Sequence, residues 1–162
     1  MSIVGDIAAS YGAPGMVLRR RLAMGEREDR ALAILMAGCT LVFVAQWPRL
    51  AREAALSGED LPMMLGSTLF AWLFIMPLVL YSIAFASYLL MRVTGGLGSS
   101  FAARLSLFWA LLASGPVMLI YGLLAGFVGP GWVLSLFGVL WLALFFWFWF
   151  AGLKEARRGA EE

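Results

Sequence analysis

Charged residues avoid three long stretches of this chain. Residues 31–48, 61–91 and 105–153 contain no Asp, Glu, Lys or Arg, and the sequence of 162 residues has no histidine. A helix of about 20 apolar residues crosses the roughly 30 Å hydrocarbon core of a bilayer. The pattern therefore predicts helices that lie in a membrane, and a composition that is 62% hydrophobic and 14% charged agrees with it.

The last of these stretches is too long for a single crossing. At residues 129–131 it reads Gly-Pro-Gly, so a proline without an amide hydrogen stands between two residues of low helix propensity. The chain is expected to reverse there, which gives two helices. Residues 61–91 suit one long or tilted span, and residues 46–48, Gln-Trp-Pro, are typical of the interfacial end of the first span.

We thus predict an all-α integral membrane protein with four transmembrane helices and an N-terminal interfacial amphipathic segment. In this interpretation residues 1–162 form a single membrane domain. Residues 1–30 are the cytoplasmic or interfacial segment, and residues 154–162 are a cytoplasmic tail. The four spans are expected at approximately 31–48, 63–91, 105–128 and 132–153.

The basic residues divide unequally between the two sides of this arrangement. Ten of them lie before the first span, between the second and third spans, or after the fourth, whereas Arg49 and Arg52 lie on the other side. Lys and Arg are enriched in the cytoplasmic loops of membrane proteins, so both termini are predicted to be cytoplasmic. An odd number of spans would put the basic cluster at 154–158 outside.

The N-terminal segment mixes apolar residues with charges. Between residues 3 and 24, Asp6 and the arginines at 19–21 interrupt the apolar positions, and a break containing glycine falls at 12–15. Two short interfacial helices fit this pattern, with their arginines among anionic headgroups. In the alternative, which the insertion rule favours, the arginines only set the orientation of the chain. The segment does not have the pattern of a secretory signal and is expected to be retained.

The residue types present argue against most chemistry. Without histidine, Ser-His-Asp and Cys-His nucleophile arrangements cannot form, and the single cysteine, Cys39, can make neither an internal disulfide nor a metal site. The predicted spans carry no charged side chain for a proton or ion relay. We therefore predict no enzymatic activity, no cofactor or bound metal, and no nucleic-acid partner.

Prolines and small residues interrupt the predicted spans. Pro77 and Pro116 each remove a helical hydrogen bond and are expected to kink their helices. Paired interruptions of this kind can also mark a transporter site, although proline is common in membrane helices. Gly122 and Gly126 form a GxxxG motif, which permits close helix contact either within the chain, the default, or between protomers.

A glycine-rich connection follows the second span. Its sequence from 94 to 101, TGGLGSSF, lacks the GxxxxGK[ST] pattern of a nucleotide-binding loop. A sharp turn is expected here, with Ser99 or Ser100 capping the next helix. The flanking arginines can meet lipid phosphates. The candidate interaction or lipid-headgroup surface therefore consists of Arg92, Gly95, Gly96, Gly98 and Arg104.

This connection and the small-residue and proline break at 113–116 resemble the Yip1 domain family. Ala13-Pro14, followed by the apolar and basic residues 17–22, is similar to the segment that precedes the first span in bacterial members. The likeness extends from about Tyr11 to the end of the chain, but the family usually has five spans and four are predicted here. Eukaryotic members are associated with Rab-type GTPases and vesicle traffic. The Ala, Gly and Arg bias of this chain suits a bacterial member, so no GTPase partner is expected.

The resemblance implies a non-enzymatic, multi-pass protein of the bacterial inner membrane. Such a protein would organise membrane or act as an accessory subunit of a membrane assembly. Its partners would be membrane lipids and either further copies of itself or another membrane protein. The alternative is a small transporter or channel for a neutral solute, with Pro77 and Pro116 near its path.

Overall fold

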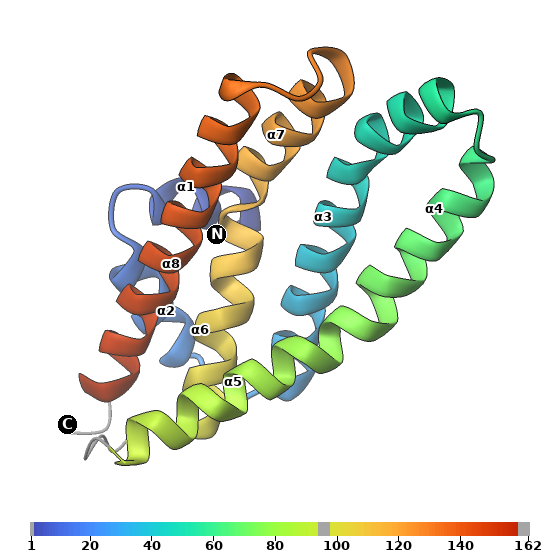
Figure 1. The fold of residues 1–162 in the computed structure, drawn as a ribbon. Coiled ribbons are helices and arrows are strands. Elements are labelled where there is room, and N and C mark those ends of the chain that lie inside the picture. The colour runs from blue at the N-terminus through green and yellow to red at the C-terminus, as the bar shows by residue number, and fades with distance from the viewer. Residues whose placement is uncertain (1, 94–97, 159–162) are drawn as a thin grey trace.

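All the regular structure of the described residues is helical. The computed structural model describes residues 2–93 and 98–158, and within these ranges no strand occurs (Figure 1). The prediction of an all-α fold is confirmed for this part of the chain. The helices are α1 (Ile3–Ser10), α2 (Pro14–Leu22), α3 (Glu28–Ser57), α4 (Leu61–Phe70), the π-helix η1 (Ala71–Ile75), α5 (Met76–Val93), α6 (Ser100–Ala113), α7 (Gly115–Phe127) and α8 (Trp132–Arg158).

Three helical runs in the described residues are long and apolar enough to cross a membrane. They are α3, the continuous run Leu61–Val93 that contains α4, η1 and α5, and α8. The helices α6 and α7 meet this test only as a pair, and the pair is bent by 42°. The predicted number of four spans is therefore reached when the bent pair counts as one span.

The first long helix extends past the residues expected at the end of its span. α3 continues through Pro48 and ends at Ser57, where Gly58 adopts a φ of 76° and donates its N–H to the carbonyl of Ala54. The residues after Pro48 include Leu, Ala, Arg and Glu, which have high helix propensity and carry the helix on. The uncharged stretch and the helix thus end at different residues.

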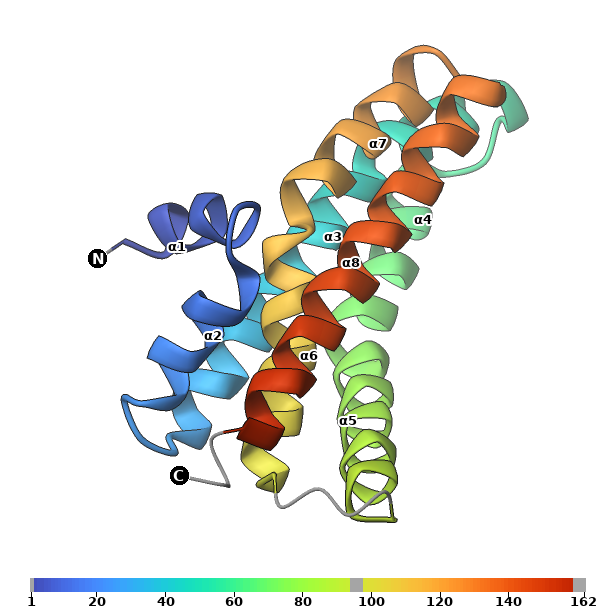
Figure 2. The same ribbon diagram turned by 90° about the vertical axis from the view of Figure 1, so that its left-hand side faces the viewer.

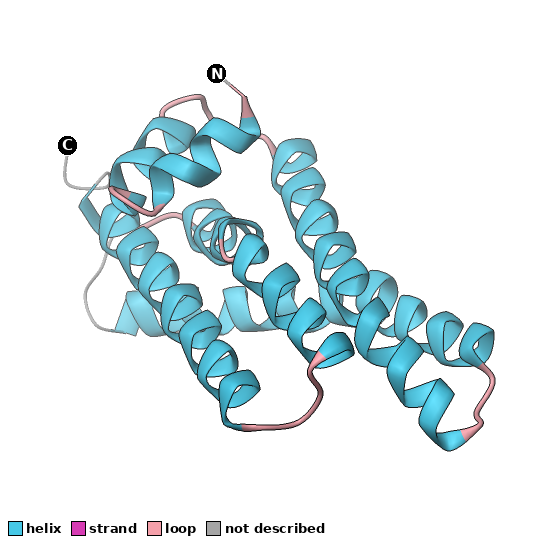
Figure 3. Cartoon of the chain, turned by 90° about the horizontal axis from the view of Figure 1, so that it is seen from above, coloured by secondary structure: helices cyan, strands magenta, loops and turns pink. Residues whose placement is uncertain are grey.

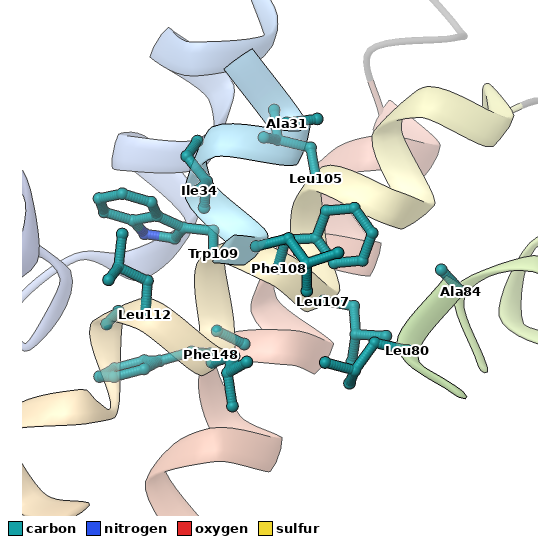
Figure 4. Packing of buried hydrophobic residues seen from close by; sticks show 14 of the residues in the cluster. Ala31, Ile34, Leu80, Ala84, Leu105, Leu107, Phe108, Trp109, Leu112 and Phe148 are labelled. Carbon is teal, nitrogen blue, oxygen red and sulfur yellow. The ribbon is translucent and has the colours of Figure 1, made fainter. Parts of the chain in front are cut away.

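The helix α6 forms the centre of the molecule. Almost all of its side chains are buried, including Phe108 and Trp109 (Figure 4). A helix that is apolar over most of its circumference buries most of its faces, and the sequence of α6 is of this kind. Its neighbours are α1, α2, α3, α5, α7 and α8.

The long helices run between two ends of the bundle. One end holds the start of α3, the end of α5, the start of α6 and the end of α8, and the other holds the α3–α4 and α7–α8 turns (Figures 1 and 2). Seen from above, α6 and α7 lie between α3 and α8 (Figure 3). The α1–α2 hairpin packs on the side of the bundle against α6 and α8.

Candidate functional site

The described members of the predicted headgroup surface contact different helices. Arg104 forms an ion pair with Glu28 at the start of α3. Gly98 is buried, and a Cβ there would lie 3.0 Å from the carbonyl oxygen of Ala156 in α8. Arg92 is exposed at the end of α5, where its Nη1 donates to the Tyr88 hydroxyl at 3.1 Å.

The remaining two members, Gly95 and Gly96, lie outside the described residues. Ser99 belongs to the same connection, and its predicted role as the cap of the next helix is confirmed. The Ser99 hydroxyl accepts a hydrogen bond from the N–H of Ala102 at 3.1 Å, which satisfies one of the amide hydrogens left unpaired at the start of α6.

Gly122 and Gly126 lie against α3 within the same chain. A Cβ added at Gly122 would stand 1.8 Å from the carbonyl oxygen of Ala45, and one at Gly126 would stand 2.5 Å from the Cβ of Pro48. Because real Cβ atoms do not approach other atoms this closely, α7 can pack on α3 only with glycine at these positions. The GxxxG motif therefore brings α3 and α7 together inside the protomer.

Pro77 stands directly after the π-helix η1. The N–H of Met76 bonds to the carbonyl of Ala71, five residues earlier, instead of the usual four. In a regular α-helix the ring of Pro77 would clash with the carbonyl four residues before it. The wider turn of η1 shifts the preceding carbonyls, so the helix passes this proline and continues to Val93.

Pro116 lies in the first turn of α7, directly after the bend between α6 and α7. The first amide groups of a helix have no partner within it, so a proline costs no hydrogen bond there. The hydroxyl of the buried Ser114 donates to the carbonyl of Leu111 at 3.1 Å. The carbonyl of Ala113, the last residue of α6, accepts a hydrogen bond from the Tyr11 hydroxyl at 3.0 Å.

Asp6 and two arginines form an ion-pair network beside α6 that sequence analysis did not predict. The Asp6 carboxylate accepts hydrogen bonds from Arg21 Nη2 at 2.7 Å and from Arg20 Nη2 at 2.9 Å. Asp6 and Arg21 are both buried. The Arg21 guanidinium also lies over the Trp109 ring, with its carbon 3.8 Å from the ring centroid, which is a favourable cation–π distance.

Ser10 connects this network to the central helix. Its hydroxyl donates to the backbone carbonyl of Asp6 at 2.8 Å and accepts a hydrogen bond from the Trp109 indole N–H at 3.0 Å. Asp6 and Ser10 are four residues apart and so share a face of α1. That spacing indicates, from the sequence alone, that α1 carries a polar face. The partner of Ser10 in α6, Trp109, lies 99 residues away and could not be inferred in this way.

The outer faces of α5 and α8 are apolar and uncovered by the rest of the chain. Leu78 in α5 is 70% exposed and Val139 in α8 is 64% exposed. Other large apolar side chains of the same helices are also exposed: Phe85, Leu90, Leu136 and Phe150. Apolar surface on this scale belongs against lipid or a partner protein.

Comparisons with known proteins give no relative for this chain. No protein-family model matches the sequence, no curated protein is significantly similar to it, and no solved structure matches it. The resemblance to the Yip1 domain family therefore stays a prediction.

Proposed function

We propose that this chain is a four-span protein of the bacterial inner membrane with both termini in the cytoplasm. The candidate spans support its membrane location. The orientation is supported by the uneven division of the basic residues: the bundle end that holds the α3 start, the α5 and α8 ends and the α6 start carries most of them. The cytoplasmic side of membrane proteins is the side enriched in Lys and Arg.

Within that membrane we propose a non-enzymatic, Yip1-like role as an organiser of membrane or an accessory subunit of a membrane assembly. The observation that carries this proposal is the pair of uncovered apolar faces on α5 and α8 around a core that is already filled. A protein whose spans surround a packed core contributes mainly its outer surface to an assembly. Helix–helix contacts at that surface are then the means by which it acts.

Site-specific photocrosslinking in native membranes tests this role. A photoreactive residue at Val139 in α8 or at Leu78 in α5 should give a discrete product whose mass equals two copies of the chain or the chain plus one other membrane protein. Leu107 is the control, because it is buried in the core and should crosslink only within the chain. Adducts with lipid alone at both outer positions would contradict the accessory role.

A second candidate function, transport of a neutral solute, is favoured by one cavity. This cavity of about 510 Å³ lies between α3, α7 and α8. Its lining includes the polar side chains of Gln46, Tyr121 and Ser135. Purified protein in liposomes should then move small neutral solutes, and Pro116→Leu should abolish that flux; liposomes that stay impermeable would exclude this function.

A further inference from the structure

A second cavity, of about 370 Å³, opens between the α1–α2 hairpin and α3. Its polar wall consists of Arg20 and Arg21 from α2, Arg30 from α3 and Asp6 from α1. Three guanidinium groups and one carboxylate give this wall a net charge of +2. The rest of the lining is apolar, and Leu112 of α6 contributes to it.

Two guanidinium groups of this wall share one carboxylate. The single carboxylate of Asp6 bonds both Arg20 and Arg21. Arg21 is 7% exposed, and its Nε has no hydrogen-bond partner. Burial lowers the pKa of Arg21, Asp6 opposes this, and the charges of Arg30 and Arg20 lower the pKa further. An anion in the cavity would relieve the repulsion among these cations.

The α3 side of the cavity has the form of an apolar strip with a cation at one end. Arg30, Ala33, Ile34 and Ala37 line it, and their spacing of three and four residues puts them on one face of the helix. Seven residues of helix extend for about 10 Å. Arg30 stands directly before the uncharged stretch that begins at residue 31. The small side chains of Ala33 and Ala37 leave room beside the helix for a hydrocarbon chain.

We propose that this cavity binds one anionic phospholipid, with its phosphate at the arginines and an acyl chain along Ala33 and Ala37. Guanidinium groups match phosphate oxygens in geometry and bind them through charge-assisted hydrogen bonds. Along α3 the cation of Arg30 comes first and the apolar strip follows it. A phospholipid has the same order, with a charged headgroup followed by an acyl chain. This proposal rests on the membrane location given above and assigns a lipid class to the N-terminal hairpin.

Native mass spectrometry of the full chain in mild detergent, with phosphatidylglycerol or phosphatidylcholine added, tests the proposal. The wild-type chain should retain phosphatidylglycerol in preference to phosphatidylcholine. Loss of one charge-assisted contact in Arg30→Gln should weaken phosphatidylglycerol binding about tenfold. Ala37→Phe, which fills the apolar strip without changing charge, should weaken it as well. Arg27→Gln is the matched control, because it removes an exposed arginine at the start of α3, outside the cavity, and should leave binding unchanged.

Three outcomes would overturn the proposal. Equal retention of the two lipids would show that the phosphodiester charge is not recognised. Equal weakening by Arg30→Gln and Arg27→Gln would show a diffuse charge effect in place of a site. Displacement of the lipid by inorganic phosphate, with Ala37→Phe without effect, would identify a site for free phosphate. Crosslinking from Val139 does not depend on this cavity. If the lipid experiment fails and crosslinking succeeds, the accessory role stands. If crosslinking fails and the lipid experiment succeeds, the lipid site stands.

Discussion

Arg21 shows how a charged residue is kept inside a mostly apolar molecule. Its guanidinium is bonded to Asp6 and lies on the face of Trp109. A buried charge without such partners would be strongly destabilising, whereas a paired and hydrogen-bonded charge is tolerated. The contacts join α1, α2 and α6, so the hairpin is held to the central helix by a polar contact as well as by apolar packing.

Replacement of Arg21 by methionine is expected to lower the free energy of unfolding. Asp6 keeps Arg20 but loses its shorter and more buried contact, which should cost about 2 kcal/mol. The measurement is unfolding of the purified chain in mixed detergent micelles, followed by circular dichroism.

The double variant Asp6→Asn with Arg21→Met provides the control for this prediction. Because the two side chains form one buried pair, the double variant should lose less stability than the two single variants together. Strict additivity of the single effects would mean that the ion pair does not contribute as described.

Tyr11→Phe is expected to cost about 1 kcal/mol, because the carbonyl of Ala113 loses a hydrogen bond. The ring itself stays, and with it the edge-to-face contact with Phe148. The same unfolding measurement applies, with Tyr88→Phe as the control, because the hydroxyl of Tyr88 takes part in an exposed contact with Arg92. Equal losses in the two variants would contradict a special role for Tyr11 at the bend.

Single residues could be predicted from the sequence only where their partner is near in the chain. The cap formed by Ser99 acts on an amide three residues later, and such local contacts follow from residue type. The partner of Arg104 is Glu28, 76 residues away, and the partner of Ser10 is Trp109, 99 residues away. These pairings depend on how the helices pack, which hydropathy does not specify.

At the scale of elements, the contact between α3 and α7 depends on the absence of side chains at Gly122 and Gly126. Gly122→Ala is expected to push α7 away from α3 and to destabilise the chain by about 2 kcal/mol, the usual cost of overpacking a tight contact. The free energy of unfolding in mixed micelles measures this loss.

Gly66→Ala is the matched control for this substitution. Gly66 also lies within a helix, α4, but a Cβ there would meet nothing within 4 Å. Alanine should therefore leave stability unchanged or raise it through its higher helix propensity. If Gly122→Ala were as harmless as Gly66→Ala, the close approach of the two helices would be contradicted.

The helices themselves were more predictable than their irregularities. Apolar stretches without charge predict long helices because the backbone must satisfy its own hydrogen bonds in lipid. Proline alone did not predict the local outcome: α3 continues through Pro48, η1 precedes Pro77, and the chain bends by 42° beside Pro116. The neighbours decide, since a tight packing partner or a nearby hydroxyl determines which distortion is least costly.

At the scale of the whole molecule, the sequence predicted which segments are apolar but not which of them are covered. Apart from Arg104, the residues of Phe101–Ala113 are buried. Large side chains of α8 stay exposed, although both helices are apolar and uncharged over most of their length. Coverage depends on the order in which helices pack around a centre. The N-terminal hairpin, for which an interfacial position is predicted, adds to that centre through the buried Val17 and Leu18.

The proposed orientation predicts opposite labelling at the two ends of the bundle. In a Cys39→Ala background, Ser57→Cys at the exposed end of α3 should react with a membrane-impermeant maleimide added to intact cells. Val93→Cys at the end of α5 should react only after the membrane is opened. Val93 is 85% exposed, so a thiol at this position is accessible to the reagent. The physical reason for the expectation is that the proposed topology puts ten of the twelve basic residues on the Val93 side. Labelling of both positions from outside would contradict an even number of spans, and reversed labelling would show that another feature of the chain outweighs its basic residues.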